Sequence, residues 1–246
     1  MPIIGGRAHS MEEIQAVGKL GYSCVEISLY DPAQVKVDIP QFLSLKKEYG
    51  LTYLAHFPNE GNPLDLANLR ENFVPRMHSL FELASELGIA KGTFHFWLDS
   101  RWITPDLILQ KIELILDMVA AANRVGIVLC LENLSEICTD FLPAFQRIPD
   151  LRMTLDIGHA QLLTHENTSF GFIDNHFHRI AHLHVHDNRG GKSVKDDLHL
   201  SLGEGIIDYP RIFRLLQQKS YASTITMEVK PSAMTKTREE ILQYFG

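Results

Sequence analysis

The amino-acid sequence predicts an α/β fold, a single (β/α)8 TIM barrel forming one domain over residues 1–246. Eight short apolar runs alternate with helical stretches at intervals of roughly 25–30 residues, close to the length of one βα unit. Several runs end in a histidine or an acidic residue, and in a barrel of parallel strands all such ends meet at one mouth. The length of 246 residues also suits one barrel better than two small domains.

The eight apolar runs are the predicted strands, since each is short and bounded by polar residues or glycine. They lie at residues 2–6, 23–28, 51–56, 91–96, 126–132, 151–156, 179–186 and 223–229. Two irregular segments, 57–68 and 187–208, follow predicted strands. They are therefore expected to be loops at the mouth of the barrel.

Predicted helices lie between the strands and carry recognisable end signals. The stretch 10–21 has helical apolar spacing, with Ser10 as its N-cap and Glu13 three residues further on. A second helix is expected over 68–88. A third, over 104–126, begins with a capping threonine followed by proline. Glycines stand where helices should stop, at Gly21, Gly50, Gly88 and Gly126.

Composition is that of a globular protein, with 45% hydrophobic and 22% charged residues. The first residues lack the pattern of a signal peptide, and no apolar run approaches the ~20 residues that span a bilayer, so the default expectation is a cytoplasmic protein without a membrane partner. The cysteines lack CxxC spacing, and Cys130 is expected to be a buried small hydrophobe. A net charge of −7 argues mildly against a general nucleic-acid binder.

Strand alternation predicts which side chains point into the barrel. On the seventh strand Leu183 and Val185 share one face, and His182, His184 and His186 share the other. The apolar face should pack under the helices, so the histidines should face the interior. The fourth, fifth and eighth strands agree, and place His95, Glu132 and Glu228 inward. Charged or imidazole groups there are costly unless they are paired or bound to metal.

Four inward residues at the ends of the last four strands form the core candidate site. Two glutamates, an aspartate and a histidine suit Mn²⁺, Co²⁺, Mg²⁺ or Zn²⁺ with positions left open for substrate. These residues are Glu132, Asp156, His184 and Glu228. A second set could hold one or two further ions, and its histidines favour zinc. That set is His56, His95, His159, Asp197 and His199, in which His56 and His95 could instead hold substrate oxygens.

Further residues are candidates for binding substrate. Those at the mouth or in the interior are His186, Glu26 and Trp97, with His9 of lower weight, whereas His182 sits one layer deeper and is expected to be a hydrogen-bonded core histidine. A basic, glycine-containing loop follows the seventh strand and carries Arg189, Lys192 and Lys195. These charges could stabilise a phosphate beside the metal, or the segment could simply be a solvated loop.

With these residues in place, the chain resembles the xylose isomerase-like TIM barrel superfamily, which includes sugar isomerases, ketose epimerases and endonuclease IV, an apurinic-site nuclease of AP endonuclease family 2. The motifs that carry the resemblance are LEN at Glu132, LDIGHA at Asp156, LHVHDN at His184, DLHLSLGEG at Asp197 and MEV at Glu228. The resemblance implies that the core quartet binds the divalent metal shared by the superfamily. It further implies that the second set supplies the remaining ligands of a trinuclear zinc site like that of endonuclease IV.

One departure from the nuclease pattern concerns the loop after His56. Endonuclease IV proteins place an aromatic residue there that inserts into DNA, whereas this chain has Asn59 followed by Glu60. The chain is also shorter than typical nuclease members, which puts the DNA-recognition loops in doubt. The LGEG motif and the Asp197–His199 pair occur in sugar isomerase-like members too.

Two enzymatic hypotheses follow. The first is a metal-dependent isomerase or epimerase of a sugar, sugar phosphate or related hydroxycarbonyl compound, in which Glu132 or Glu228 takes a proton from the carbon beside a carbonyl. The second is a zinc-dependent phosphodiesterase acting at abasic sites in DNA. The first is preferred on net charge and the missing aromatic residue. A metal-bound barrel that only binds a sugar ranks last, because open coordination positions in a mouth pocket usually serve chemistry. Many such barrels form homodimers, but no segment of the sequence identifies an interface.

Overall fold

The computed structural model describes residues 1–246, apart from the side chain of Val194. Eight parallel strands pair in chain order and β8 pairs back onto β1, which closes the barrel. The predicted (β/α)8 TIM barrel is confirmed, and each of the eight predicted strands is present. The strands are β1 (Ile3–Ala8), β2 (Cys24–Ser28), β3 (Thr52–His56), β4 (Lys91–Phe94), β5 (Val128–Glu132), β6 (Arg152–Asp156), β7 (Ile180–Val185) and β8 (Thr224–Met227).

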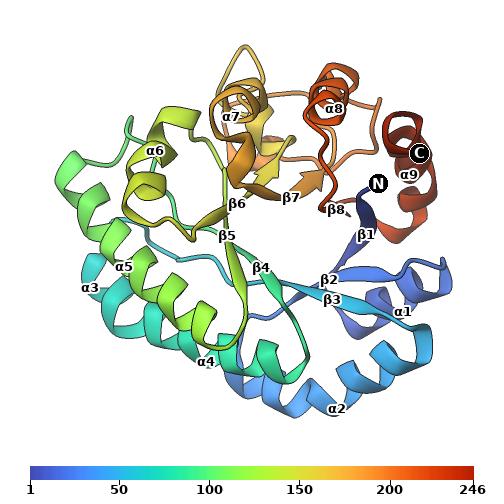
Figure 1. Ribbon diagram of the computed structural model, residues 1–246, viewed down its shortest axis with the longest axis horizontal. Helices are drawn as coiled ribbons and strands as arrows, with labels where there is room; N and C mark the ends of the chain where they lie inside the picture. Colours follow the sequence, from blue (N-terminus) through green and yellow to red (C-terminus); the bar gives the residue numbers. More distant parts are fainter.

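Helices surround the strands on the outside of the barrel, and the two termini lie close together (Figure 1). The helices are α1 (Met11–Lys19), α2 (Pro32–Tyr49), α3 (Leu66–Asn68), α4 (Val74–Glu86), α5 (Pro105–Arg124), α6 (Cys138–Arg147), α7 (Ser169–His176), α8 (Tyr209–Gln218) and α9 (Pro231–Phe245). No helix among the described residues combines the length and the apolar character that crossing a membrane would require.

Helix ends follow the signals in the sequence. The Ser10 side chain accepts a hydrogen bond from the Glu13 N–H at the start of α1, and all four predicted stop glycines adopt positive φ, between 65° and 81°. The predicted helix over 68–88 is not uniform. A π-helical turn, Leu69–Phe73, precedes α4, next to Pro75, which has no N–H to donate to the preceding turn.

The predicted alternation of inward and outward side chains is confirmed. Leu129, Leu131, Leu183 and Val185 are fully buried in the apolar layer between the barrel and its helices. Inside the barrel, the hydroxyl oxygens of Thr93 and Thr154 lie 2.8 Å apart. Cys130 is buried and unpaired, as expected. Polar groups therefore gather along the barrel axis while the apolar core forms a ring around it.

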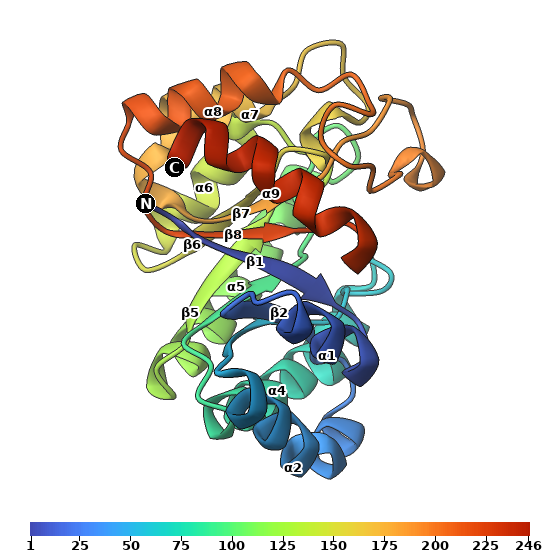
Figure 2. The same cartoon turned by 90° about the vertical axis from the view of Figure 1, so that its right-hand side faces the viewer.

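Both predicted mouth loops follow their strands. The segment after β7, orange in Figure 2, extends on the side toward which the β1 arrow points. At the opposite end of the barrel, the Lys91 ammonium donates to the Ala181 carbonyl at 2.7 Å and to the Ser223 and Thr224 hydroxyls at 2.9 Å. Lys91 therefore ties β4 to β7 and β8 across the bottom of the barrel.

Lys91→Met should lower the free energy of unfolding by roughly 2–3 kcal/mol, because three part-buried oxygen acceptors lose their hydrogen bonds to a charged donor. Urea denaturation measures this change. Lys36→Met, at an exposed position on α2, is the matched control and should change the free energy of unfolding by less than about 0.5 kcal/mol. Equal losses in the two variants would contradict this role for Lys91.

Candidate metal centre

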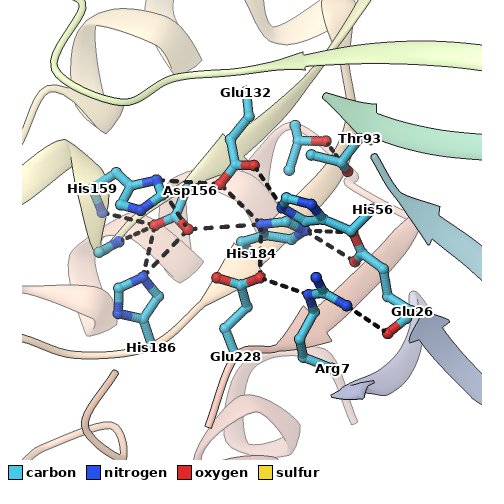
Figure 3. Close-up of polar contacts among 12 residues, drawn as sticks. Arg7, Glu26, His56, Thr93, Glu132, Asp156, His159, His184, His186 and Glu228 are labelled. Carbon is cyan, nitrogen blue, oxygen red and sulfur yellow. Dashed lines mark hydrogen bonds and ion pairs between the residues drawn. The ribbon is translucent and has the colours of Figure 1, made fainter. Parts of the chain in front are cut away.

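The four core residues converge at the mouth of the barrel, as shown in Figure 3. His184 Nδ1 lies 3.0 Å from Glu132 Oε1, 3.4 Å from Glu228 Oε1 and 3.7 Å from Asp156 Oδ2. All four side chains are buried, with at most 8% of each residue exposed. Strands β5, β6 and β7 and the residue after β8 thus aim three carboxylates at one imidazole nitrogen.

Glu26 orients the imidazole of His184 from below. The His184 Nε2–H group donates to Glu26 Oε2 at 2.9 Å, which leaves Nδ1 facing the three carboxylates. His182 Nε2 donates to the same oxygen at 2.9 Å, and His182 Nδ1 lies 2.6 Å from the Thr224 hydroxyl. His182 is therefore a hydrogen-bonded core histidine, as predicted. Glu26, predicted to contact substrate, is fully buried beneath the site instead.

The backbone around Asp156 is fixed by its neighbours. The Asn133 side chain donates to the Asp156 carbonyl and accepts from the Asp156 N–H, both at 2.9 Å. Asp156 Oδ1 accepts from the N–H groups of Gly158 and His159. A Cβ on Gly158 would lie 2.0 Å from the His186 ring, so only glycine fits this position. These contacts explain the asparagine of LEN and the glycine of LDIGHA, two residues whose roles the sequence alone did not reveal.

Part of the second candidate set gathers around Glu132. Its Oε2 lies 2.7 Å from His95 Nε2 and 3.4 Å from His56 Nε2. On the far side of the ring, the His95 Nδ1–H group donates to Asn59 Oδ1 at 2.6 Å, so Asn59 orients the ring with Nε2 toward Glu132. His56, His95 and Glu132 form one grouping whose potential ligand atoms all lie within 4.8 Å of one another.

The loop after β7 supplies the remaining residues of the second set. Asp197 Oδ2 lies 3.2 Å from His159 Nε2 and 3.0 Å from His199 Nε2. His199 adopts a left-handed backbone conformation, with φ of 47°, which is rare for a residue with a side chain. The structure therefore brings all five members of this set to the mouth, in two groups on either side of the core quartet.

Asp187 holds this loop in place. Its carboxylate accepts hydrogen bonds from the N–H groups of Asn188, Gly203, Gly205 and Ile207 at 2.9–3.1 Å. A Cβ on Gly205 would lie 2.1 Å from the Asn188 carbonyl oxygen and 2.2 Å from Asp187 Oδ1. The LGEG motif is therefore explained by close packing of the loop backbone against Asp187.

Arg7 is a site residue that sequence reasoning missed. Its side chain is buried, and Nε lies 3.4 Å from Glu228 Oε1. The other guanidinium nitrogens donate to the Glu26 carbonyl, the Ser28 hydroxyl and the Tyr30 hydroxyl. The signal in the sequence was an arginine inside an apolar strand, where an unpaired charge is costly.

Electrostatics at the mouth favour positive charge. Burial opposes protonation of His184, but attraction to Glu228, Glu26 and Glu132 outweighs it and raises the pKa of His184 well above its usual value. Burial likewise opposes ionisation of Glu228, yet His184 and Arg7 lower the pKa of that carboxyl to about 2. The cluster therefore stabilises cations even though its groups are removed from water.

The spacing of the donor atoms also fits a metal ion. Two donors bound to one ion at about 2.1 Å lie roughly 3.0–3.4 Å apart. The distances of 3.0, 3.4 and 3.7 Å from His184 Nδ1 to the three carboxylates lie close to that range. Oxygen-rich donors with one imidazole suit Mn²⁺, Mg²⁺, Co²⁺ or Zn²⁺.

A pocket of about 480 Å³ opens beside the cluster. Its walls include His95, His159 and Asp197 from the second set, and Trp97 and Lys192 from the candidates for substrate binding. His186 lies outside this lining and is fully buried against Asp156, 3.1 Å from Oδ1. Arg189 and Lys195 are exposed and also lie outside the lining. His9 lines a separate pocket between α1 and α2.

Residues 14–244 match the family described as "Xylose isomerase-like TIM barrel". The chain belongs to this family. It is also similar to an uncharacterized protein of Methanocaldococcus jannaschii, MJ1311, with 26% identity over 223 residues, which covers 85% of this chain and 74% of that protein.

Solved structures share the fold. A D-tagatose 3-epimerase-like protein has a TM-score of 0.80 and 23% identity, with coverage of 98% of this chain and 97% of that one. The IOLI protein with a bound zinc atom has a TM-score of 0.81 and 13% identity, with coverage of 99% of each chain. At these identities the likeness establishes the barrel architecture.

Asn59→Leu should weaken binding of a divalent ion that uses His95 by roughly 10–100-fold, because the ring loses the acceptor that orients it. Asn59→Asp keeps an acceptor and should retain the affinity. Competition with a chelator, together with the ion count per chain, measures the effect. Asn72→Leu, at an exposed helical position outside the pocket lining, is the matched control. Unchanged affinity in Asn59→Leu would show that Asn59 does not position His95.

Proposed function

We propose that this protein is a divalent-metal-dependent isomerase or epimerase that acts on a sugar or a related hydroxycarbonyl compound. The observation that carries the proposal is the convergence of Glu132, Asp156 and Glu228 on Nδ1 of His184, at distances of 3.0–3.7 Å. These four residues would hold the metal. His56, His95, His159, Asp197 and His199 would hold a second or third ion, or orient substrate oxygens.

A bound divalent ion would polarise the substrate carbonyl and stabilise the negative charge of an ene-diolate. The two glutamates are suited to the proton transfers, because their carboxylates approach Nδ1 of His184 from different directions (Figure 3). One carboxylate would remove the proton from the carbon beside the carbonyl, and the opposite carboxylate, His56 or His95 would return a proton to the ene-diolate.

The two glutamates have different surroundings. Glu132 contacts His95 and His184, whose charges outweigh the effect of burial and hold its pKa well below the usual value. Glu228 lies beside Arg7 and His184. Both are weak bases in this state, so a carboxylate that accepts the substrate proton must first be released from some of these contacts.

The size of the pocket supports a small substrate. A volume of about 480 Å³ is within the range of pockets that hold small molecules. Two loop residues beside this pocket are already engaged: Asn59 accepts from His95, and Glu60 is paired with the fully buried Lys111 at 2.8 Å. The loop after β3 thus contacts the candidate metal cluster through Asn59 and α5 through Glu60. Asn59 stands where the nuclease pattern has an aromatic side chain.

A second candidate function, a zinc-dependent phosphodiesterase acting at abasic DNA, is favoured by one specific observation. Histidines or carboxylates of the second set flank the core quartet on both sides, with contacts of 2.7 Å from His95 to Glu132 and 3.2 Å from His159 to both Glu132 and Asp197. Such an arrangement could hold more than one ion, and clusters of ions suit phosphoryl chemistry.

Glu228→Gln should abolish turnover, with a loss of at least about 100-fold, while the circular dichroism spectrum stays unchanged. Turnover is measured by NMR as deuterium uptake from D2O at the carbon beside the carbonyl, over a panel of ketoses and other hydroxycarbonyl compounds. Glu113→Gln, at an exposed ion pair with Arg147, is the matched control. Retained exchange in Glu228→Gln would refute the catalytic assignment.

Removal of divalent ions by a chelator should abolish this exchange, and Mn²⁺ or Zn²⁺ should restore it. Elemental analysis of the purified protein then separates the two candidate functions, because one ion per chain supports the isomerase and three zinc ions support the nuclease. An oligonucleotide duplex with one abasic site provides the direct comparison. Efficient nicking of that duplex would overturn the isomerase proposal.

A further inference from the structure

The pocket beside the metal cluster is lined by two chemically different sets of side chains. One set consists of imidazole and carboxylate groups from His95, His159 and Asp197. The other set is apolar and comes from four separate mouth segments, after β3, β4, β5 and β6. Those side chains are Pro63, Trp97, Leu134, Leu162 and Leu163.

Several polar side chains that line the pocket together with these apolar residues are already paired within the protein. The Ser135 hydroxyl accepts from Trp97 Nε1 at 2.9 Å and donates to Asp99 at 2.7 Å. The Glu60 carboxylate accepts from the Trp97 N–H and from Lys111. The Ser193 hydroxyl donates to Asp196. Outside the imidazole and carboxylate set, the described side chains of the lining offer a polyol few hydrogen-bond donors besides the Asn59 amide nitrogen and the Lys192 ammonium.

Leu163 adopts an unusual backbone conformation in this wall. Its φ of 57° lies in the left-handed region, which residues with a side chain rarely occupy. The Leu163 N–H donates to the Gly191 carbonyl at 2.8 Å, and this bond joins the segment after β6 to the loop after β7. Backbone strain of this kind persists where the surrounding structure enforces it, and it is concentrated at functional sites.

From the pocket wall we infer that the substrate carries an apolar hydrocarbon or aryl substituent, not a polyol chain, on the side of its hydroxycarbonyl group remote from the metal cluster. Hydroxyl groups buried against proline and leucine side chains would lose their hydrogen bonds to water without replacement. An aryl or alkyl group would bury apolar surface against Trp97 and the leucines. This inference rests on the proposed metal-dependent function and narrows its substrate class.

Three hydroxamates that share one chelating head but differ in the arm test the inference on the zinc-loaded protein. Acetohydroxamate has a methyl arm, phenylacetohydroxamate a benzyl arm, and 2,3,4-trihydroxybutanohydroxamate a polyol arm. Isothermal titration calorimetry gives each dissociation constant. The benzyl arm should tighten binding at least tenfold over methyl, equivalent to about 1.4 kcal/mol, and the polyol arm should give no gain.

A variant of the apolar pocket wall separates the contribution of the arm to the affinity from that of the chelating head. Leu163→Gly removes the side chain and suits the left-handed backbone, so the fold is retained. It should reduce the advantage of the benzyl arm at least threefold and leave acetohydroxamate affinity within twofold of the wild type. Leu64→Gly, at an exposed leucine of the β3 loop outside the pocket lining, is the matched control and should change neither value.

The outcomes distinguish this inference from the proposed function. Equal affinities for the three arms, or tighter binding of the polyol arm, would overturn the apolar-substituent inference while leaving the metal-dependent site intact. If none of the three compounds binds in a zinc-dependent manner, the proposed metal site and the inference built on it both fail. If phenylacetohydroxamate still binds at least tenfold more tightly than acetohydroxamate in Leu163→Gly, Leu163 does not contribute to recognition of the arm.

Discussion

The imidazole of His184 is the group on which the mouth of this barrel depends. One ring nitrogen is fixed by the buried Glu26, and the other faces Glu132, Asp156 and Glu228. Three carboxylates this close would repel one another in a low-dielectric interior unless positive charge lies between them. His184 occupies that central place. Burial alone would lower the pKa of its ring, but attraction to the surrounding carboxylates is stronger and raises it.

Hydrogen bonds to the backbone fix the segments that carry the groups around His184. The Asn133 side chain bonds to both the N–H and the carbonyl of Asp156. The Asp187 carboxylate accepts from four N–H groups of the loop that carries Asp197 and His199. Gly158 and Gly205 permit approaches that any side chain would prevent. The site is preorganised because its supporting polar groups are satisfied by the protein itself.

The pocket at the mouth combines two kinds of side chain. Histidine and carboxylate groups come from His95, His159 and Asp197, and apolar side chains come from the segments after β3, β4, β5 and β6. In the proposed function the polar set and the core quartet perform metal binding and proton transfer, while the apolar set recognises the rest of the substrate. A rigid barrel can combine the two because its loops vary independently of its strands.

The sequence by itself determined the barrel and the core quartet. Both follow from local patterns, because alternation along a strand decides which side chains face inward and parallel strands end at one rim. Glu132, Asp156, His184 and Glu228 could therefore be assembled from their positions at strand ends. Only the tertiary structure decided that Glu26 lies beneath the site, that Arg7 contacts Glu228, and that Asn59 orients His95. Glu26 and His184 are 158 residues apart in the chain, and which polar group meets which across the barrel depends on its closure and on the paths of its loops, neither of which leaves a periodic signal in the sequence.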